Sequence, residues 1–178
     1  MYKRQVERRL VAPDDSPLTA LGWEQARAAA DRLVPLEISQ ILVSPALRAR
    51  QTADVVRAAC PEASVCVLDA LRERSFGAMD SWTREQLDAS PWAATRVAWS
   101  RSVPGGESLA AVAVRAADGL RTHSKAGVTL VVSHAGVIRA LVGLIDGLPT
   151  EAIGRMRVPH VVPWTRRVSP EEWRTLRW

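Results

Sequence analysis

The sequence has few residues that can form cross-links or metal sites, with only two cysteines and three histidines among 178 residues. Cys60 and Cys66 do not form a CxxC pair, and no pair of histidines accompanies them. These spacings exclude a zinc site and a disulfide framework as the basis of the fold. Cys66 lies in the apolar run 65–68 and is expected to be a small core residue. We therefore expect reduced thiols and no bound metal.

Long apolar runs are also absent. No window approaches the roughly 18 consecutive apolar residues that a membrane-spanning helix needs. The first five residues are mostly polar and charged, so they do not form an apolar signal segment. The sequence therefore predicts no membrane span, and we expect the protein in the cytoplasm.

Lysine is nearly absent, so the basic surplus comes from arginine. The formal net charge is +5, yet only Lys3 and Lys125 are lysines. A basic balance raises the hypothesis of nucleic-acid binding. The arginines are scattered, however, with local clusters only at residues 8–9 and 166–167. A dispersed set indicates a solvated surface, so nucleic acid is not an expected partner.

Alternating strand and helix patterns are what the sequence does contain. Hydrophobic residues make up 47% of the chain, which suits a single domain over residues 1–178. Apolar runs predict strands at 38–43, 65–68 and 128–132, and one or two more within 156–167. Periodicity and capping residues predict helices at 19–34, 44–59, 83–89, 91–100 and 108–122, and one from the turn at 135–136 to residue 144. This order predicts an α/β fold, a three-layer α/β/α sandwich with a mostly parallel sheet.

Local signals fix the start of two of these helices. Thr19 is expected to be the N-cap of the helix over 19–34. Ser44 is expected to cap the helix that follows the strand over 38–43, with Pro45 in its first turn.

Three polar residues each follow a different predicted strand. Arg48 lies in the first helical turn after the first of these strands, Glu73 in the loop after the second, and His134 directly after the third. Ligands bind at the carboxyl ends of parallel strands, and helix N-termini at that edge favour anions. We therefore expect the three side chains to converge on one edge of the sheet.

The three residue types suit phosphate chemistry. A guanidinium such as that of Arg48 can grip a phosphate with two parallel hydrogen bonds. The half-buried carboxyl of Glu73 can act as a general acid, and the His134 imidazole can donate to a phosphoryl oxygen. Each residue alone also fits a structural role. Arg48 suits an exposed surface, His134 suits a cap of the strand–helix turn, and Glu73 suits an ion pair with Arg72 or Arg74.

Five segments in order along the chain resemble one family. They are SPLTALG at 16–22, SPALRARQTA at 44–53, LRERSFG at 71–77, GGES at 105–108 and SHAGVIRAL at 133–141. On these segments the chain resembles the histidine phosphatase superfamily, whose fold is phosphoglycerate mutase-like. The resemblance covers nearly the whole chain.

The resemblance implies a mechanism without metal or cofactor. In the family a histidine takes the phosphoryl group as a phosphohistidine, two arginines and a second histidine hold the phosphoryl oxygens, and a carboxylic acid protonates the leaving oxygen. Mapped onto this chain, Arg48 matches the second arginine, Glu73 the proton donor and His134 the second histidine. The Ala135 N–H is expected to face the phosphate.

The resemblance also implies substrate contacts and a partner. The segment formed by Gly106, Glu107 and Ser108 is expected to bind substrate. The expected partner is a small phosphorylated molecule. Neither the identity of that substrate nor the oligomeric state follows from the sequence.

One family feature is missing from the sequence. The family nucleophile lies in an Arg-His-Gly motif at the end of a central first strand, and no such motif occurs here. Residues 5–10 resemble the segment just after that motif. We expect the printed chain to lack the nucleophile, the first phosphate arginine and that strand, with Met1 as an internal methionine. We also expect marginal stability and no turnover.

Three functional interpretations stay open. The first is a phosphomonoester phosphatase that acts through a phosphohistidine in a full-length form. The second is phosphoglycerate mutase-type phosphotransfer. The third is a non-catalytic phosphate-binding protein that keeps Arg48 and His134.

Overall fold

The computed structural model describes residues 9–169 and 172. The strands are β1 (Ile38–Val43), β2 (Ser64–Val67) and β3 (Val128–Val132). The α-helices are α2 (Ala20–Leu33), α3 (Leu47–Ala59), α4 (Arg84–Asp88), α5 (Leu109–His123), α6 (Ala135–Ile145) and α7 (Thr150–Arg155). Short 3₁₀ turns are η1 (Val34–Leu36), η2 (Asp69–Leu71), η3 (Gly77–Met79) and η4 (Ala93–Arg96).

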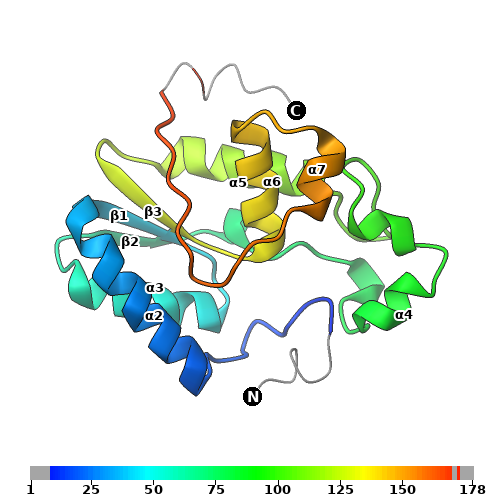
Figure 1. Ribbon diagram of the computed structural model, residues 1–178, viewed down its shortest axis with the longest axis horizontal. Helices are drawn as coiled ribbons and strands as arrows, with labels where there is room; N and C mark the ends of the chain where they lie inside the picture. The colour runs from blue at the N-terminus through cyan, green and yellow to red at the C-terminus, as the bar shows by residue number, and fades with distance from the viewer. Residues whose placement is uncertain (1–8, 170–171, 173–178) are drawn as a thin grey trace.

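The three strands form a parallel sheet in the order β2-β1-β3 (Figure 1). Val43 at the end of β1 pairs with Val67 on one side and with Val132 on the other. All three carboxyl ends therefore reach the same edge, where His134 follows β3 and Ser44 follows β1. The predicted parallel α/β architecture is confirmed.

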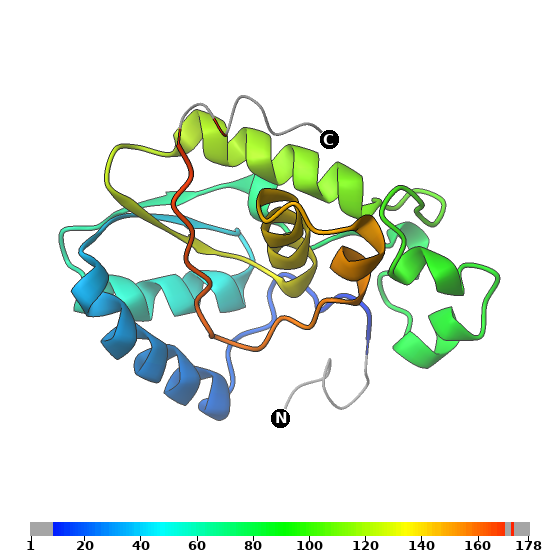
Figure 2. The same cartoon turned by 45° about the horizontal axis from the view of Figure 1, so that its top comes forward.

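Helices cover both faces of the sheet, which gives the predicted three layers. Figure 2 shows α5 on one side of the sheet and α2 and α3 on the other. Ile41 and Val43 of β1 belong to the core that includes side chains of α2 and α3, whereas Leu42 belongs to the core with α5 and α6. Alternate side chains of a strand point to opposite faces, and with both faces covered the central strand β1 is buried at five of its six positions.

Three local predictions are wrong. Residues 156–167 form no strand, because Pro159 and Pro163 each lack the N–H that a sheet ladder uses. The helix predicted at 91–100 is only the short turn η4. Ser44 does not cap α3, whose N-cap is Ala46 without a side-chain hydrogen bond. The structure also contains α7, which the sequence analysis did not predict.

The segment after α7 runs beside the sheet without joining it (Figure 1). Its carbonyl at Val161 accepts a hydrogen bond from Arg32 of α2, and Arg166 pairs with Asp146 after α6. Among the described residues β3 pairs with β1 alone, so its outer edge is open. The described strands β1 and β3 are hydrogen-bonded directly to each other.

One buried amide fastens the start of the β1–β3 pair. Gln40 is 2% exposed, and its Nε2 donates to the carbonyl of His123 over 2.9 Å. Its Oε1 accepts from the Lys125 N–H over 3.0 Å and from the Thr129 hydroxyl over 3.2 Å. The buried Gln40 side chain therefore links strand β1 to the loop between α5 and β3.

We predict that Gln40→Leu lowers the free energy of unfolding by about 1–3 kcal/mol, because the loop groups lose a buried partner. Urea unfolding monitored by circular dichroism measures this change. The control is Ser39→Ala, which removes an exposed hydroxyl bonded to the Val128 carbonyl on the same strand pair. Equal midpoints for the two variants would contradict the role given to Gln40.

Candidate functional site

His134 stands where β3 ends and α6 begins. It is the N-cap of α6 and is 6% exposed, so its imidazole is held inside the molecule. Its Nε2 lies 2.7 Å from Ser44 Oγ, and its Nδ1 lies 3.2 Å from Nη2 of Arg48. The structure thus brings together two of the three predicted residues.

The strand pairing explains why these residues meet. The Ser44 N–H donates to the Val132 carbonyl over 3.0 Å, which extends the β1–β3 ladder one residue past both strands. Arg48 follows in the first turn of α3, and its Nη1 donates to the Pro13 carbonyl over 3.0 Å. The guanidinium therefore bridges the loop before α2 and the imidazole at the end of β3.

Glu73 reaches the same corner from the loop after η2. Its Oε1 accepts from the Gly136 N–H over 3.2 Å and from the Arg74 N–H over 3.0 Å. A Cβ at position 136 would lie 2.6 Å from this oxygen, so the glycine lets the carboxyl approach α6. The neighbouring Arg72 pairs with two aspartates instead, one of which is Asp69. The carboxyl of the third predicted residue thus contacts the backbone two residues after His134.

The first turn of α6 adds an electrostatic feature to the corner. Ala135 is the first residue of the helix, and N–H groups of a first turn have no partner within their own helix. The helix dipole places partial positive charge at the same point. This end of α6 therefore suits an anion. That the Ala135 N–H faces a phosphate stays a prediction.

Two arginines that the sequence analysis missed hold the Glu73 loop. Arg74 is 3% exposed and donates to the carbonyls of Thr95, Arg96 and Glu107. Burial, helped by the positive charge of Arg139, lowers the pKa of Arg74 to about 10. Since its donors meet carbonyl oxygens, this buried cation ties the segment around α4 and η4 to the site loop.

Arg115 of α5 is the second of these arginines. It donates to the carbonyls of Ala70 and Glu73, and its ion pair with Glu107 has an Nε–Oε1 distance of 2.6 Å. Arg115 lies three residues after the buried Val112, in a helix with an apolar face. A charged residue at that spacing from a core position is the sequence signal that could have identified it. Nothing in the local sequence distinguishes Arg74 from its neighbour Arg72.

The predicted substrate-binding segment supports the Glu73 loop in this structure. Gly106 packs against that loop, where a Cβ would lie 2.9 Å from the Ser75 carbonyl. Glu107 accepts from Arg115 and from the Ser75 N–H, and Ser108 caps α5 through the Ala111 N–H. A contact of these three residues with substrate remains a prediction.

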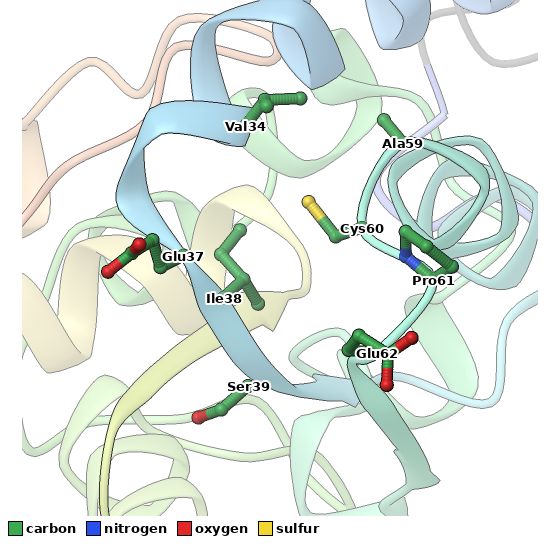
Figure 3. Close-up of a pocket in the computed structure, with 8 residues that line it drawn as sticks. All are labelled: Val34, Glu37, Ile38, Ser39, Ala59, Cys60, Pro61 and Glu62. Carbon is green, nitrogen blue, oxygen red and sulfur yellow. The ribbon is translucent and has the colours of Figure 1, made fainter.

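A separate depression of about 330 Å³ lies at the opposite end of the sheet (Figure 3). Its lining consists of Val34, Glu37, Ile38, Ser39, Ala59, Cys60, Pro61 and Glu62. The two carboxylates there would repel a phosphate group, whereas the corner at His134 sets a guanidinium and a helix N-terminus beside the single carboxyl of Glu73. Charge therefore favours the His134 corner for an anionic ligand.

Two further searches cover the described part of the chain. No helix in residues 9–169 is long and apolar enough to cross a membrane. Within the same residues no group of three or more histidine, cysteine or acidic side chains is placed to hold a metal ion.

Comparison with known sequences gives a consistent result. The sequence profile of the histidine phosphatase superfamily (branch 1) matches residues 2–178. The chain is similar to the probable phosphoglycerate mutase GpmB of Photorhabdus laumondii subsp. laumondii, with 32% identity over 165 residues, 85% of this chain and 73% of the relative. It is 35% identical to the protein of that name from Enterobacter sp. (strain 638) over 159 residues, 85% of this chain and 74% of the relative.

Solved structures show the same similarity. Mycobacterial glucosyl-3-phosphoglycerate phosphatase, in complex with inorganic phosphate, has a TM-score of 0.71 and 29% identity, covering 84% of this chain and 78% of its own. YhfR of Bacillus stearothermophilus has a TM-score of 0.73 and 26% identity, covering 85% of this chain and 78% of its own.

The Glu107–Arg115 pair gives a prediction about pH. Burial raises the pKa of Glu107, but hydrogen bonds from Arg115 and the Ser75 N–H outweigh it, so the pKa is lowered from 4.5. A carboxyl with a depressed folded-state pKa stabilises the fold above its unfolded-state pKa, and this contribution disappears as the pH falls through the folded-state value.

We predict that Glu107→Gln lowers the free energy of unfolding by about 1 kcal/mol at neutral pH, because a neutral amide accepts weaker hydrogen bonds than a carboxylate. The difference from wild type should shrink as the pH falls below 4.5. Denaturant unfolding across this range measures it, with the exposed Glu24→Gln as control. A difference in the free energy of unfolding that stays constant with pH would contradict a stabilising role of the Glu107–Arg115 ion pair.

Proposed function

This chain belongs to the histidine phosphatase superfamily, and we propose that it binds a small phosphorylated molecule at the corner formed by Arg48, His134 and the start of α6. The observation that carries this proposal is the 3.2 Å contact between the Arg48 guanidinium and the His134 imidazole at a helix N-terminus. Two side chains that can donate to phosphoryl oxygens there face the positive end of a helix dipole.

Each group has a proposed role on a bound phosphomonoester. Arg48 holds two phosphoryl oxygens with its planar fork, while the Ala135 N–H and His134 hold others. Glu73 stands beside them as the proton donor for the ester oxygen. Its position at the Gly136 N–H supports this role, because the carboxyl is fixed beside the phosphate corner without an ion pair to Arg72.

Hydrolysis by this mechanism needs a nucleophile in addition to these groups. A ring nitrogen of a further histidine, distinct from His134, would attack phosphorus, and the ester oxygen would leave with the proton of Glu73. Water would then attack the phosphohistidine and give its proton to the Glu73 carboxylate. The other two histidines are exposed, and His123 lies at the opposite end of the sheet, where its carbonyl accepts from Gln40.

We therefore propose binding without turnover for the 178-residue chain. A form with an Arg-His-Gly strand ahead of residue 5 is proposed to be a phosphomonoester phosphatase. The similarity to a glucosyl-3-phosphoglycerate phosphatase supports hydrolysis, whereas the similarity to probable phosphoglycerate mutases supports phosphotransfer as the alternative for that form. A phosphate-binding protein without catalysis is the proposal that fits the printed sequence itself.

We predict that Arg48→Met weakens the binding of inorganic phosphate by about 10- to 100-fold, the loss expected for a charge-assisted hydrogen bond. Isothermal titration calorimetry on the 178-residue chain measures this dissociation constant. Arg50→Met is the matched control, because Arg50 is an exposed arginine of the same helix. An equal loss of phosphate affinity in both variants would show that the effect comes from net charge alone. An absence of phosphate binding to the wild-type chain would refute the proposed function.

We predict no phosphate release from p-nitrophenyl phosphate by the 178-residue chain. In the form extended by an Arg-His-Gly strand, Glu73→Gln should slow hydrolysis of alkyl phosphates more than that of aryl phosphates, because alkoxide leaving groups need the proton most. Steady-state rates over a series of leaving groups measure this dependence. Equal slowing across the series would remove Glu73 from the proton-donor role.

A further inference from the structure

Both ring nitrogens of His134 have a partner, and the partners fix where the proton sits. Arg48 Nη2 lies 3.2 Å from Nδ1, and a guanidinium can only donate, so Nδ1 must accept. A neutral imidazole carries one ring proton, which must then be on Nε2. Ser44 Oγ, 2.7 Å away, is the acceptor of that proton.

Ser44 is held firmly enough to act as this acceptor. Its side chain is fully buried, and its own N–H is bonded to the Val132 carbonyl over 3.0 Å. The Ala46 N–H points at Oγ from 3.4 Å on the other side. The serine oxygen therefore lies in a fixed place beside the imidazole, set by the strand pairing and by the start of α3.

We propose that Ser44 is a positioning residue that, together with the Arg48 donor at Nδ1, holds His134 as the Nε2–H tautomer and keeps Nδ1 as an acceptor facing the phosphate corner. This inference rests on the proposed phosphate-binding function and deepens it. Without ligand, the His134 ring then has no proton on Nδ1 and cannot donate a hydrogen bond from there to a phosphoryl oxygen. The ligand must then be a protonated phosphate, or the imidazole must gain a proton when the ligand arrives.

The proton balance of binding follows from this arrangement. A phosphate monoanion carries a P–O–H proton, and transfer of that proton to Nδ1 leaves a phosphate dianion beside an imidazolium. The Nε2–H bond to Ser44 stays in place throughout. Arg48 turns its N–H from Nδ1 to the dianion, so the hydrogen bonds given up by the ring are replaced by bonds to the ligand.

Charged groups of several elements lie near the ring, and a phosphate dianion would add negative charge that favours the imidazolium form. Arg48 contacts the ring from α3, Arg139 lies one turn further along α6, and the positive end of the α6 dipole adds to both. Glu73 provides opposite charge from its loop, and Asp14 is engaged in an ion pair with an arginine. The dianion supplies the charge that makes the protonated ring favourable.

Nitrogen-15 NMR of the histidine rings tests the tautomer in the 178-residue chain at about pH 8, above the ordinary histidine pKa of about 6.5. His123 is an internal reference, because its Nδ1 lies 2.9 Å from the Gly119 carbonyl, which can only accept. We expect His123 to carry its proton on Nδ1 and His134 to carry its proton on Nε2. Saturation with inorganic phosphate should then protonate both nitrogens of His134.

Variants separate Ser44 from the rest of the strand. Ser44→Ala removes the acceptor of the Nε2 proton, so the buried Nε2–H is left unsatisfied and the preference that Arg48 imposes at Nδ1 is partly offset. We expect a mixture of His134 tautomers and phosphate binding weaker by about 5- to 10-fold, the loss of one hydrogen bond. Ser39→Ala is the control, because it removes a hydroxyl at the far end of β1 that contacts the Val128 carbonyl. It should leave both the spectrum and the affinity unchanged.

An Nδ1–H signal for His134 in the unliganded wild-type chain overturns the inference, and so does a Ser44→Ala spectrum identical to wild type. The wild-type spectrum decides the tautomer even where the variant fails to fold. An Nε2–H ring in a chain that binds no phosphate supports the Ser44 contact and refutes the proposed function. Phosphate binding by a chain whose His134 carries its proton on Nδ1 supports the proposed function and refutes the Ser44 inference.

Discussion

The parallel pairing of β1 with β3 is the constraint on which the site depends. It places the ends of two strands, more than eighty residues apart in sequence, at one edge, where the Ser44 N–H bonds to the Val132 carbonyl. The contacts of His134 with Ser44 and Arg48 follow from this register. A shift of β3 by one residue would turn each of its side chains to the other face and separate the imidazole from Ser44 and Arg48.

Arg74, which is buried, and Arg115, which is half-buried, hold the Glu73 loop in place. Arg74 and Arg115 lie beneath the loop that carries Glu73, and their donors meet backbone carbonyls and the Glu107 carboxylate. A buried cation is costly unless its hydrogen bonds are satisfied, so these contacts tie separate segments together. The loop can therefore present the Glu73 carboxyl to α6 with no regular secondary structure of its own.

Binding and chemistry are proposed to depend on different parts of this protein. The guanidinium, the imidazole and the helix N-terminus that suit a phosphate are all contributed by the described residues. The phosphohistidine chemistry proposed for the extended form needs a further histidine; His123 lies at the opposite end of the sheet and His160 is exposed. Serine, arginine and imidazole form a connected set, so the same hydrogen bonds that hold an anion also govern the proton of His134.

Local patterns in the sequence predicted the parallel α/β architecture and the positions of Arg48, Glu73 and His134 just after strands, because apolar runs and helix periodicity are local properties. They failed at residues 156–167, where two prolines remove ladder donors that the apolar pattern did not reveal. They assigned Ser44 to a helix cap, since a serine before a proline suits that role locally. The contact of Ser44 with His134 and the burial of Arg74 but not of Arg72 arise only in the folded chain, because they join distant segments whose separation no local pattern encodes.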